Sequence, residues 1–141
     1  MTNSINHYVL DACALIAFFN DEEGAEKAEQ LLKQAKAGNV KLSAMSINLY
    51  EVYYDALRHK PLEEAKKLLV DMYAMPITII EKLDRSLIQT AAYYKTTYSM
   101  SVADSFALAL ATQLDASLVS TDHHEFDEVD KSGEVTFFWL R

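Results

Sequence analysis

Short apolar runs alternate along the chain with longer stretches in which apolar residues recur at helical spacing. Three short apolar runs that contain β-branched residues predict strands at 7–11, 76–80 and 116–121, and weaker runs predict strands at 40–43 and 135–138. The stretches between them predict helices at about 13–20, 23–37, 47–59, 62–74, 84–97 and 102–114. Strands and helices are therefore expected to alternate along most of the chain.

This alternation predicts the architecture. Short buried strands separated by helices favour a parallel sheet, because each parallel connection needs an element that carries the chain back. We therefore expect an α/β fold, a three-layer α/β/α arrangement with a central, mostly parallel sheet, and residues 1–141 as one domain. In open sheets of this kind ligands bind outside the carboxyl ends of the strands.

Composition indicates the compartment. Half of the residues are hydrophobic, and only 3 Gly and 2 Pro are present, which favours regular elements joined by short loops. The single cysteine, Cys13, excludes an internal disulfide framework and favours a reducing compartment. No apolar run reaches the roughly 18 residues that a membrane span needs, and Met1–Ser4 lacks the features of a secretion signal. We expect a soluble, cytoplasmic protein with no membrane partner.

The formal net charge of −8 argues against nucleic-acid binding by bulk electrostatic attraction. Residues 71–141 hold 11 acids and 5 bases, so the acidity is concentrated in the second half. We interpret the densest basic cluster as a solvated helix face, with phosphate binding as the alternative; it consists of Arg58, His59, Lys60, Lys66 and Lys67. Tyr50, Tyr53 and Tyr54 are interpreted as residues that pack in the core and at an interface rather than as platforms for bases.

Four acidic residues stand at the ends of predicted elements: Asp11, Glu51, Asp104 and Asp122. Asp11 and Asp122 close predicted strands, whereas Glu51 and Asp104 lie near the starts of apolar helices. No Lys or Arg near Asp11 in the sequence balances its charge, although its neighbours are almost wholly apolar. Carboxylates that gather at one edge of a sheet raise each other's pKa unless a divalent cation neutralises them. The pattern therefore predicts a metal site.

Each of these acids also has a structural interpretation. Asp11 could simply cap the helix that follows it, and Asp104 fits a capping box that begins at Ser101. Glu51 lies about one turn after Ser46, which we expect to cap its helix. Its neighbours are mostly apolar, so its carboxylate should either pair with another side chain or coordinate a metal ion. Capping and metal binding are compatible roles, so these interpretations do not remove the predicted site.

The last acidic position is open to alternatives. Asp122 lies in a segment that we expect to be a loop, and Asp122, Glu125 or Asp127 could turn towards the site. His123 and His124 resemble a zinc pair, but adjacent side chains point apart on a helix or a strand, and zinc sites prefer wider spacing.

Oxygen ligands alone favour a hard cation, Mg²⁺ or Mn²⁺. Such ions assist hydrolysis of phosphodiesters, because they lower the pKa of an attacking water and stabilise the leaving oxygen. The sequence shows no Ser-His-Asp order, Gly-rich phosphate loop or dinucleotide-binding fingerprint that would indicate another chemistry.

The segments that contain these acids resemble, in order and spacing, the motifs of the PIN-domain nucleases, in particular the VapC-type toxins of toxin–antitoxin pairs. The four segments are Tyr8–Leu15, Asn48–Val52, Met100–Ala109 and Leu118–Asp122. The resemblance implies that Asp11, Glu51, Asp104 and Asp122 bind one or two Mg²⁺ or Mn²⁺ ions and direct water onto an RNA phosphodiester. It also implies a cognate antitoxin protein that covers the site, and a homodimer.

Two positions depart from the family pattern. Cys13 stands where the family usually has a small hydroxyl residue, so a thiol could replace that polar contact, although we favour buried helical filler as its role. Ser120 stands where the family often has Thr. It keeps a hydroxyl that can orient Asp122, so we expect Ser120 to support the site from behind the metal ligands.

Other functions compete with a nuclease. A phosphatase that uses Asp11 as its nucleophile needs a second Asp two places later, where this chain has Cys13. A receiver-type signalling domain needs an acidic pair near the first strand and a Lys at a late strand end, and neither is evident. A non-catalytic PIN-like binding or scaffold protein stays open as the alternative.

Overall fold

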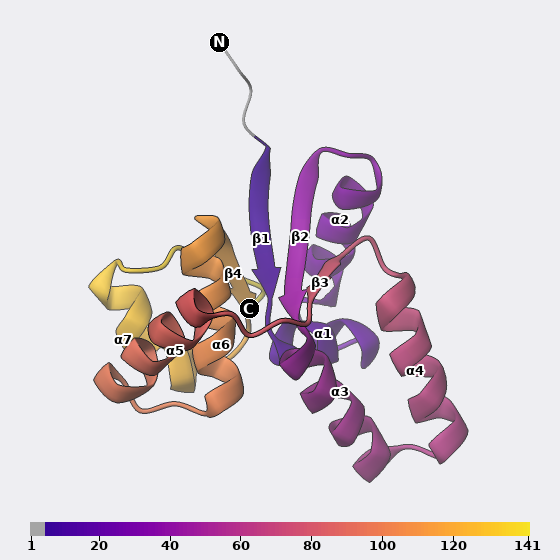
Figure 1. Cartoon of the computed structure of the whole chain (residues 1–141). Helices are drawn as coiled ribbons and strands as arrows, with labels where there is room; N and C mark the ends of the chain where they lie inside the picture. The colour runs from indigo at the N-terminus through magenta and orange to yellow at the C-terminus, as the bar shows by residue number, and fades with distance from the viewer. Residues whose placement is uncertain (1–4) are drawn as a thin grey trace.

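The computed structural model describes residues 5–141 (Figure 1). Met1–Ser4, the start that we interpreted as lacking a secretion signal, lies outside the described residues. The elements in chain order are β1 (Asn6–Leu10), α1 (Ala12–Phe19), α2 (Ala25–Lys36), β2 (Val40–Met45), α3 (Ser46–His59), α4 (Leu62–Ala74), β3 (Thr78–Ile80), α5 (Arg85–Thr97), α6 (Val102–Leu114), β4 (Ser117–Ser120), α7 (His123–Ser132) and β5 (Phe137–Trp139). Over residues 5–141, no helix combines the length and the apolar character that crossing a bilayer requires.

The five strands form one sheet in the order β3-β2-β1-β4-β5. Each neighbouring pair is parallel, and β1 lies at the centre between β2 and β4. Leu10 at the end of β1 pairs with Val119 near the end of β4, so the carboxyl ends of these strands meet at one edge. The predicted α/β/α fold with a mostly parallel sheet is confirmed.

Helices cover both faces of the sheet. Successive side chains of a strand point to opposite faces, so apolar side chains on both faces need a layer of helices to bury them. Val9 and Leu118 pack into a core with buried side chains of α5, α6 and α7. Their neighbours Leu10 and Val119 pack on the opposite face with buried side chains of α1, α2, α3 and α4. Figure 1 shows the two groups of helices on either side of the central strands. The α3 and α4 helices form a hairpin that extends away from the sheet.

Several boundaries differ from the prediction. The strands expected at 76–80 and 135–138 are only three residues each, Thr78–Ile80 and Phe137–Trp139. The helix expected at 23–37 begins at Ala25, because Gly24 adopts the left-handed conformation (φ +96°). A Cβ at Gly24 would lie 2.7 Å from the Leu140 carbonyl oxygen. Glycine thus lets the chain turn tightly against the C-terminal segment.

The segment after Asp122 was expected to be a loop, and that prediction was wrong. Residues His123–Ser132 form α7, which buries Phe126 and Val129 and exposes mainly polar and charged side chains. Two buried residues in ten give a weak helical period in the sequence. The helix is instead stabilised by packing of Phe126 in the core and by the Asp122 side chain, which caps its first turn.

Candidate functional site

The predicted acidic residues lie around the carboxyl edge of the central strands. Asp11 directly follows β1, Asp122 lies two residues beyond β4, and the Asp11 amide donates to the Val119 carbonyl at 3.3 Å. Glu51 comes from α3, which follows β2, and Asp104 comes from the first turn of α6. Repulsion from other members of the set contributes to the raised pKa values of Asp11, Glu51 and Asp104. Their roles as ligands stay predictions.

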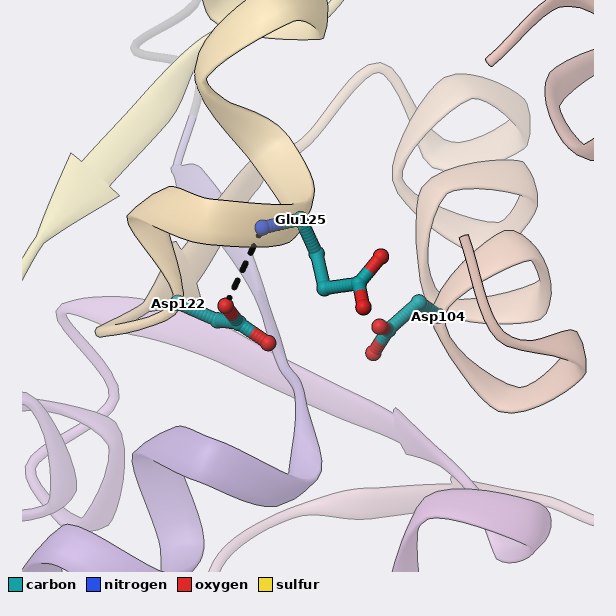
Figure 2. A group of neighbouring side chains, drawn as sticks. All are labelled: Asp104, Asp122 and Glu125. Atoms are coloured by element: carbon teal, nitrogen blue, oxygen red, sulfur yellow. Dashed lines mark hydrogen bonds between the residues drawn. The ribbon is translucent and has the colours of Figure 1, made fainter. Parts of the chain in front are cut away.

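Two of these residues form a compact group with Glu125. Asp104, Asp122 and Glu125 each place one carboxylate oxygen so that the three oxygens lie within 4.8 Å of one another. Figure 2 shows Glu125 reaching from α7 towards Asp104, with Asp122 beside it. Across residues 5–141, this is the one group of three or more His, Cys, Asp or Glu side chains close enough to share a metal ion. Asp11 and Glu51 lie outside the compact group.

Asp11 is fully buried and caps α1. Its Oδ1 accepts a hydrogen bond from the Ala14 amide at 2.7 Å, and its Oδ2 accepts one from the Ser120 hydroxyl at 2.5 Å. Burial raises the pKa of Asp11 to about 8, despite these two hydrogen bonds, and repulsion from Asp104 and Asp122 adds to the rise. The cap and the acidic site therefore coexist at this residue, and a cation nearby would favour its ionised form.

Ser120 connects the two strand ends. Its hydroxyl donates to Asp11, and its Oγ accepts a hydrogen bond from the Asp122 amide at 3.0 Å. The sequence predicted that Ser120 orients Asp122. The structure shows contact with the Asp122 backbone, and it adds a direct bond to the Asp11 carboxylate, so one hydroxyl contacts both residues.

Asp104 lies in the first turn of α6, where the Ser101 hydroxyl accepts a hydrogen bond from the Asp104 amide at 3.1 Å. Its side chain faces the other acids and the residue is only 8% exposed. Burial raises the pKa of Asp104 to about 7, with further contributions from Glu51, Asp122 and Glu125. The capping interaction at Ser101 was predicted, and it fixes the start of the helix that carries Asp104.

Glu51 is held by Asn48, a residue that sequence reasoning missed. Asn48 Nδ2 donates to Glu51 Oε1 at 3.4 Å and to the Ala103 carbonyl at 3.3 Å, so it joins α3 to the start of α6. Asn48 is fully buried, and within residues 5–141 its Oδ1 has no hydrogen-bond partner. Burial raises the pKa of Glu51, an effect that the Asn48 contact opposes. A polar residue one turn before Glu51 was the available signal.

The start of α3 differs from the prediction. Met45 occupies the cap position and Ser46 is the first helical residue, without a side-chain cap. The expectation that Ser46 caps this helix was therefore wrong. Because Met45 is the last residue of β2, the helix begins directly at the strand end, and Glu51 is carried by its second turn.

The alternatives at the last acidic position are now distinguished. Asp122 caps α7, accepting a hydrogen bond from the Glu125 amide at 3.1 Å (Figure 2), and Glu125 turns towards Asp104. Asp127 contacts His123 Nδ1 at 2.8 Å instead. Asp122 and Glu125 therefore both face the site. Glu125 could have been selected from the sequence only if α7 had been recognised, because its direction depends on helical geometry.

Cys13 faces the acids more directly than expected. It is partly exposed, and its thiol donates to Asp122 Oδ2 with an S–O distance of 3.9 Å. Burial and the surrounding carboxylates raise the pKa of Cys13, so the thiol remains protonated. Our preference for buried filler was wrong, because the side chain is half-buried and its thiol contacts Asp122; that the thiol replaces the family's polar contact stays a prediction.

The two adjacent histidines do not form a metal pair. The His123 ring stacks on Trp139 with ring centroids 3.7 Å apart, and His123 Nε2 contacts the Arg141 carbonyl oxygen at 2.8 Å. Hydrogen bonds to Arg141 and Asp127 raise the pKa of His123. His123 is thus a structural residue that holds the C-terminal segment against α7.

The donors at this edge fit a hard divalent cation. Five carboxylates face it, and within residues 5–141 none of them forms an ion pair with Lys, Arg or His; they are Asp11, Glu51, Asp104, Asp122 and Glu125. Several like charges with raised pKa values form a site that a cation stabilises strongly. Carboxylate oxygens suit hard cations better than thiophilic ones.

Known structures share this fold at low sequence identity. A toxin–antitoxin complex from Klebsiella pneumoniae is 18% identical, with 84% of this chain and 89% of that chain covered and a TM-score of 0.64. VapBC2 from Rickettsia felis, bound to a DNA fragment from its promoter, is 17% identical, with 94% and 98% covered and a TM-score of 0.71. VapC20 from Mycobacterium tuberculosis, a Sarcin-Ricin loop cleaving toxin, is 13% identical, with 86% and 94% covered and a TM-score of 0.67.

Sequence comparison shows the family. No curated protein matches the chain significantly. The PIN domain family model matches residues 8–132, which include all five carboxylates of the edge. The chain therefore belongs to the PIN domain family.

Proposed function

We propose that this protein is a Mg²⁺- or Mn²⁺-dependent endoribonuclease that acts as the toxin of a toxin–antitoxin pair. The observation that carries the proposal is the oxygen cluster of Asp104, Asp122 and Glu125 beside the fully buried Asp11. Carboxylates that gather at a buried or half-buried site repel one another unless a cation binds between them, and sites of this kind commonly serve catalysis. Family membership supports the reaction class.

Within this proposal, Asp11, Glu51, Asp104 and Asp122 surround the cation and Glu125 adds a fifth carboxylate. When bound, the cation lowers the pKa of an attacking water and stabilises charge on the leaving oxygen. Ser120 positions Asp11 and the backbone of Asp122 through its hydrogen bonds, and Asn48 positions Glu51. Such support matters because small displacements of ligands greatly reduce metal affinity and rate.

The proposed partners follow from the similar structures. One of them is a toxin–antitoxin complex, and another is a toxin that cleaves the Sarcin-Ricin loop. We propose RNA as the substrate, a cognate antitoxin protein that covers the acidic edge, and a homodimer of this chain. Light scattering of the purified chain should give twice the monomer mass of 15.9 kDa, and a monomer at micromolar concentration would contradict the homodimer.

RNA cleavage by the purified protein tests the activity. Cleavage should require Mn²⁺ or Mg²⁺, stop with a chelator, and fall by about a hundredfold or more in Asp11→Asn and Asp104→Asn. Asp84→Asn is the matched control, because Asp84 caps α5 through the Leu87 amide just as Asp11 caps α1 through Ala14. Full activity in all variants would contradict the proposal, and a parent that cuts no RNA would favour a binding or scaffold role.

A further inference from the structure

The α3 helix carries a row of exposed and half-buried side chains that begins beside the acidic edge. Tyr50, Tyr54 and Arg58 are four residues apart, so their side chains lie along one face of the helix. The rings of Tyr50 and Tyr54 meet edge to face with centroids 5.3 Å apart, and Arg58 Cζ lies 5.1 Å from the centroid of Tyr54. We call Tyr50, Tyr54 and Arg58 the α3 ladder.

The α3 ladder is accessible. Tyr50 is 62% exposed, Arg58 is exposed and Tyr54 is half-buried. Tyr50 therefore does not pack in the core of the chain, and the expectation that it packs at an interface stays a prediction. A large ring costs free energy when it stays in water, and neighbouring exposed apolar groups commonly mark a binding surface.

The ladder leads outward from the candidate site. Tyr50 directly precedes Glu51, and Arg58 lies seven residues after Glu51 on nearly the same side of α3, about 10 Å further along its axis. Figure 1 shows that α3 runs away from the carboxyl edge of the sheet. A polymer bound at the acidic edge would thus continue along the ladder.

Charge favours this side of the site for a polyanion. The opposite wall, α7, contains four acids and one base, Lys131. The segment 54–67 contains three acids, Asp55, Glu63 and Glu64, and four bases, in a chain whose net charge is −8. Within residues 5–141, Arg58 forms no ion pair with a carboxylate. A phosphate backbone would meet repulsion along α7, and along α3 it would meet a guanidinium that contacts the Tyr54 ring and pairs with no carboxylate among residues 5–141.

We propose that the α3 ladder binds a single-stranded segment of RNA that adjoins the cleaved phosphodiester. Unpaired bases stack on the tyrosine rings, and the Arg58 guanidinium contacts a backbone phosphate. Stacking on aromatic rings tolerates any base sequence, whereas Arg supplies the charge contact that an acidic protein otherwise lacks. This inference rests on the proposed ribonuclease function, since the substrate it positions is RNA.

Binding measured without cleavage tests the ladder. In an Asp104→Asn background, anisotropy of a labelled 12-nucleotide RNA of randomised sequence reports affinity. We expect Tyr50→Ala and Tyr54→Ala each to weaken binding about tenfold, and Arg58→Ala to weaken it and to reduce its salt dependence by about one phosphate contact. Tyr50→Phe should retain affinity because the ring remains. Tyr93→Ala, which removes an exposed tyrosine of α5, is the matched control.

Failure of the ladder is distinguishable from failure of the proposed function. If the parent cuts RNA but the Tyr50, Tyr54 and Arg58 variants bind RNA as tightly as Tyr93→Ala does, the ladder proposal is overturned and the nuclease stands. If these variants bind RNA normally but lose the antitoxin, the surface binds a protein and the ladder proposal is again overturned. RNA binding that depends on the ladder without any cleavage by the parent would support the ladder and contradict the nuclease.

Discussion

Ser120 Oγ lies 2.5 Å from Asp11 Oδ2, and this contact ties the end of β4 to the end of β1 within the core of the candidate site. The same oxygen accepts a hydrogen bond from the Asp122 amide. A hydroxyl is suited to this position because it donates to one group while it accepts from another. Both acids consequently depend on one side chain for their placement.

Ser120→Ala should disturb both acids. It removes the donor to a fully buried carboxylate, so we expect the free energy of unfolding to fall by about 1–3 kcal/mol and RNA cleavage to fall about tenfold or more. Ser120→Thr keeps the hydroxyl and should stay close to the parent. Chemical denaturation and cleavage rates measure the two effects, and an alanine variant with the parent's activity would exclude this role of Ser120.

Stability of the metal-free protein should decrease as pH rises. Burial raises the pKa of Asp11 from 3.8 to about 8 and that of Asp104 to about 7. Because each carboxyl group has a higher pKa in the folded state than in the unfolded state, the folded protein binds more protons at any pH between the two pKa values of that group. The favourable contribution of these two groups to the free energy of unfolding is fully present below about pH 4 and is lost as the pH rises to about 8. Chemical denaturation at several pH values between 4 and 8, in the presence of a chelator, measures this change in the free energy of unfolding.

Asp11→Asn provides the control for this pH dependence. An amide at this position does not ionise, so the decrease between pH 4 and pH 8 should become clearly shallower in the variant. Asp84→Asn, at the corresponding cap of α5, should keep the parent's slope. Equal slopes in all three proteins would show that Asp11 does not carry the raised pKa.

Metal binding should offset the repulsion. At a Mn²⁺ concentration a hundredfold above the dissociation constant, the folded protein should gain about 2.7 kcal/mol. The gain should be largest near pH 8, where the carboxylates are ionised, and should shrink near pH 5 because protons compete with the ion. Thermal unfolding with and without Mn²⁺ measures this, and a gain that does not depend on pH would contradict binding at these acids.

Asn48→Leu should separate stability from metal affinity. The buried Asn48 Oδ1 has no partner over residues 5–141, and a buried unpaired carbonyl costs about 1–3 kcal/mol. An apolar residue of similar size should therefore leave the unfolding temperature unchanged or raise it, while loss of the Glu51 contact weakens Mn²⁺ binding about tenfold. Calorimetry and thermal unfolding provide the two readings. Strong destabilisation with unchanged Mn²⁺ affinity would assign Asn48 a purely structural role.

The elements that could be predicted from the sequence are those whose buried residues recur at regular spacing. The apolar runs of β1 and β4 and the apolar face of α6 follow directly from their residues, and parallel topology then places Asp11 and Asp122 at one edge. The prediction failed at α7, where Phe126 and Val129 alone are buried among polar residues. Because that helix was missed, Glu125 remained one of several alternatives.

Other features depend on contacts that are distant in the sequence. Asn48 meets the carbonyl of Ala103, 55 residues away, and its unpaired Oδ1 is visible only in three dimensions. The exposure of Tyr50 likewise depends on how α3 leaves the sheet. The hydrophobic pattern predicts which residues are buried. The Asn48–Ala103 contact and the exposure of Tyr50 depend instead on how the helices are placed relative to one another.

Anomalous diffraction from crystals grown with saturating Mn²⁺ measures the proposed cation site most directly. We expect a manganese peak bounded by carboxylate oxygens of Asp104, Asp122 and Glu125, with Asp11 and Glu51 adjoining it, and loss of the peak in Asp104→Asn. Crystals of the parent that show no manganese at this edge under saturating conditions would contradict the metal site and the proposed nuclease chemistry.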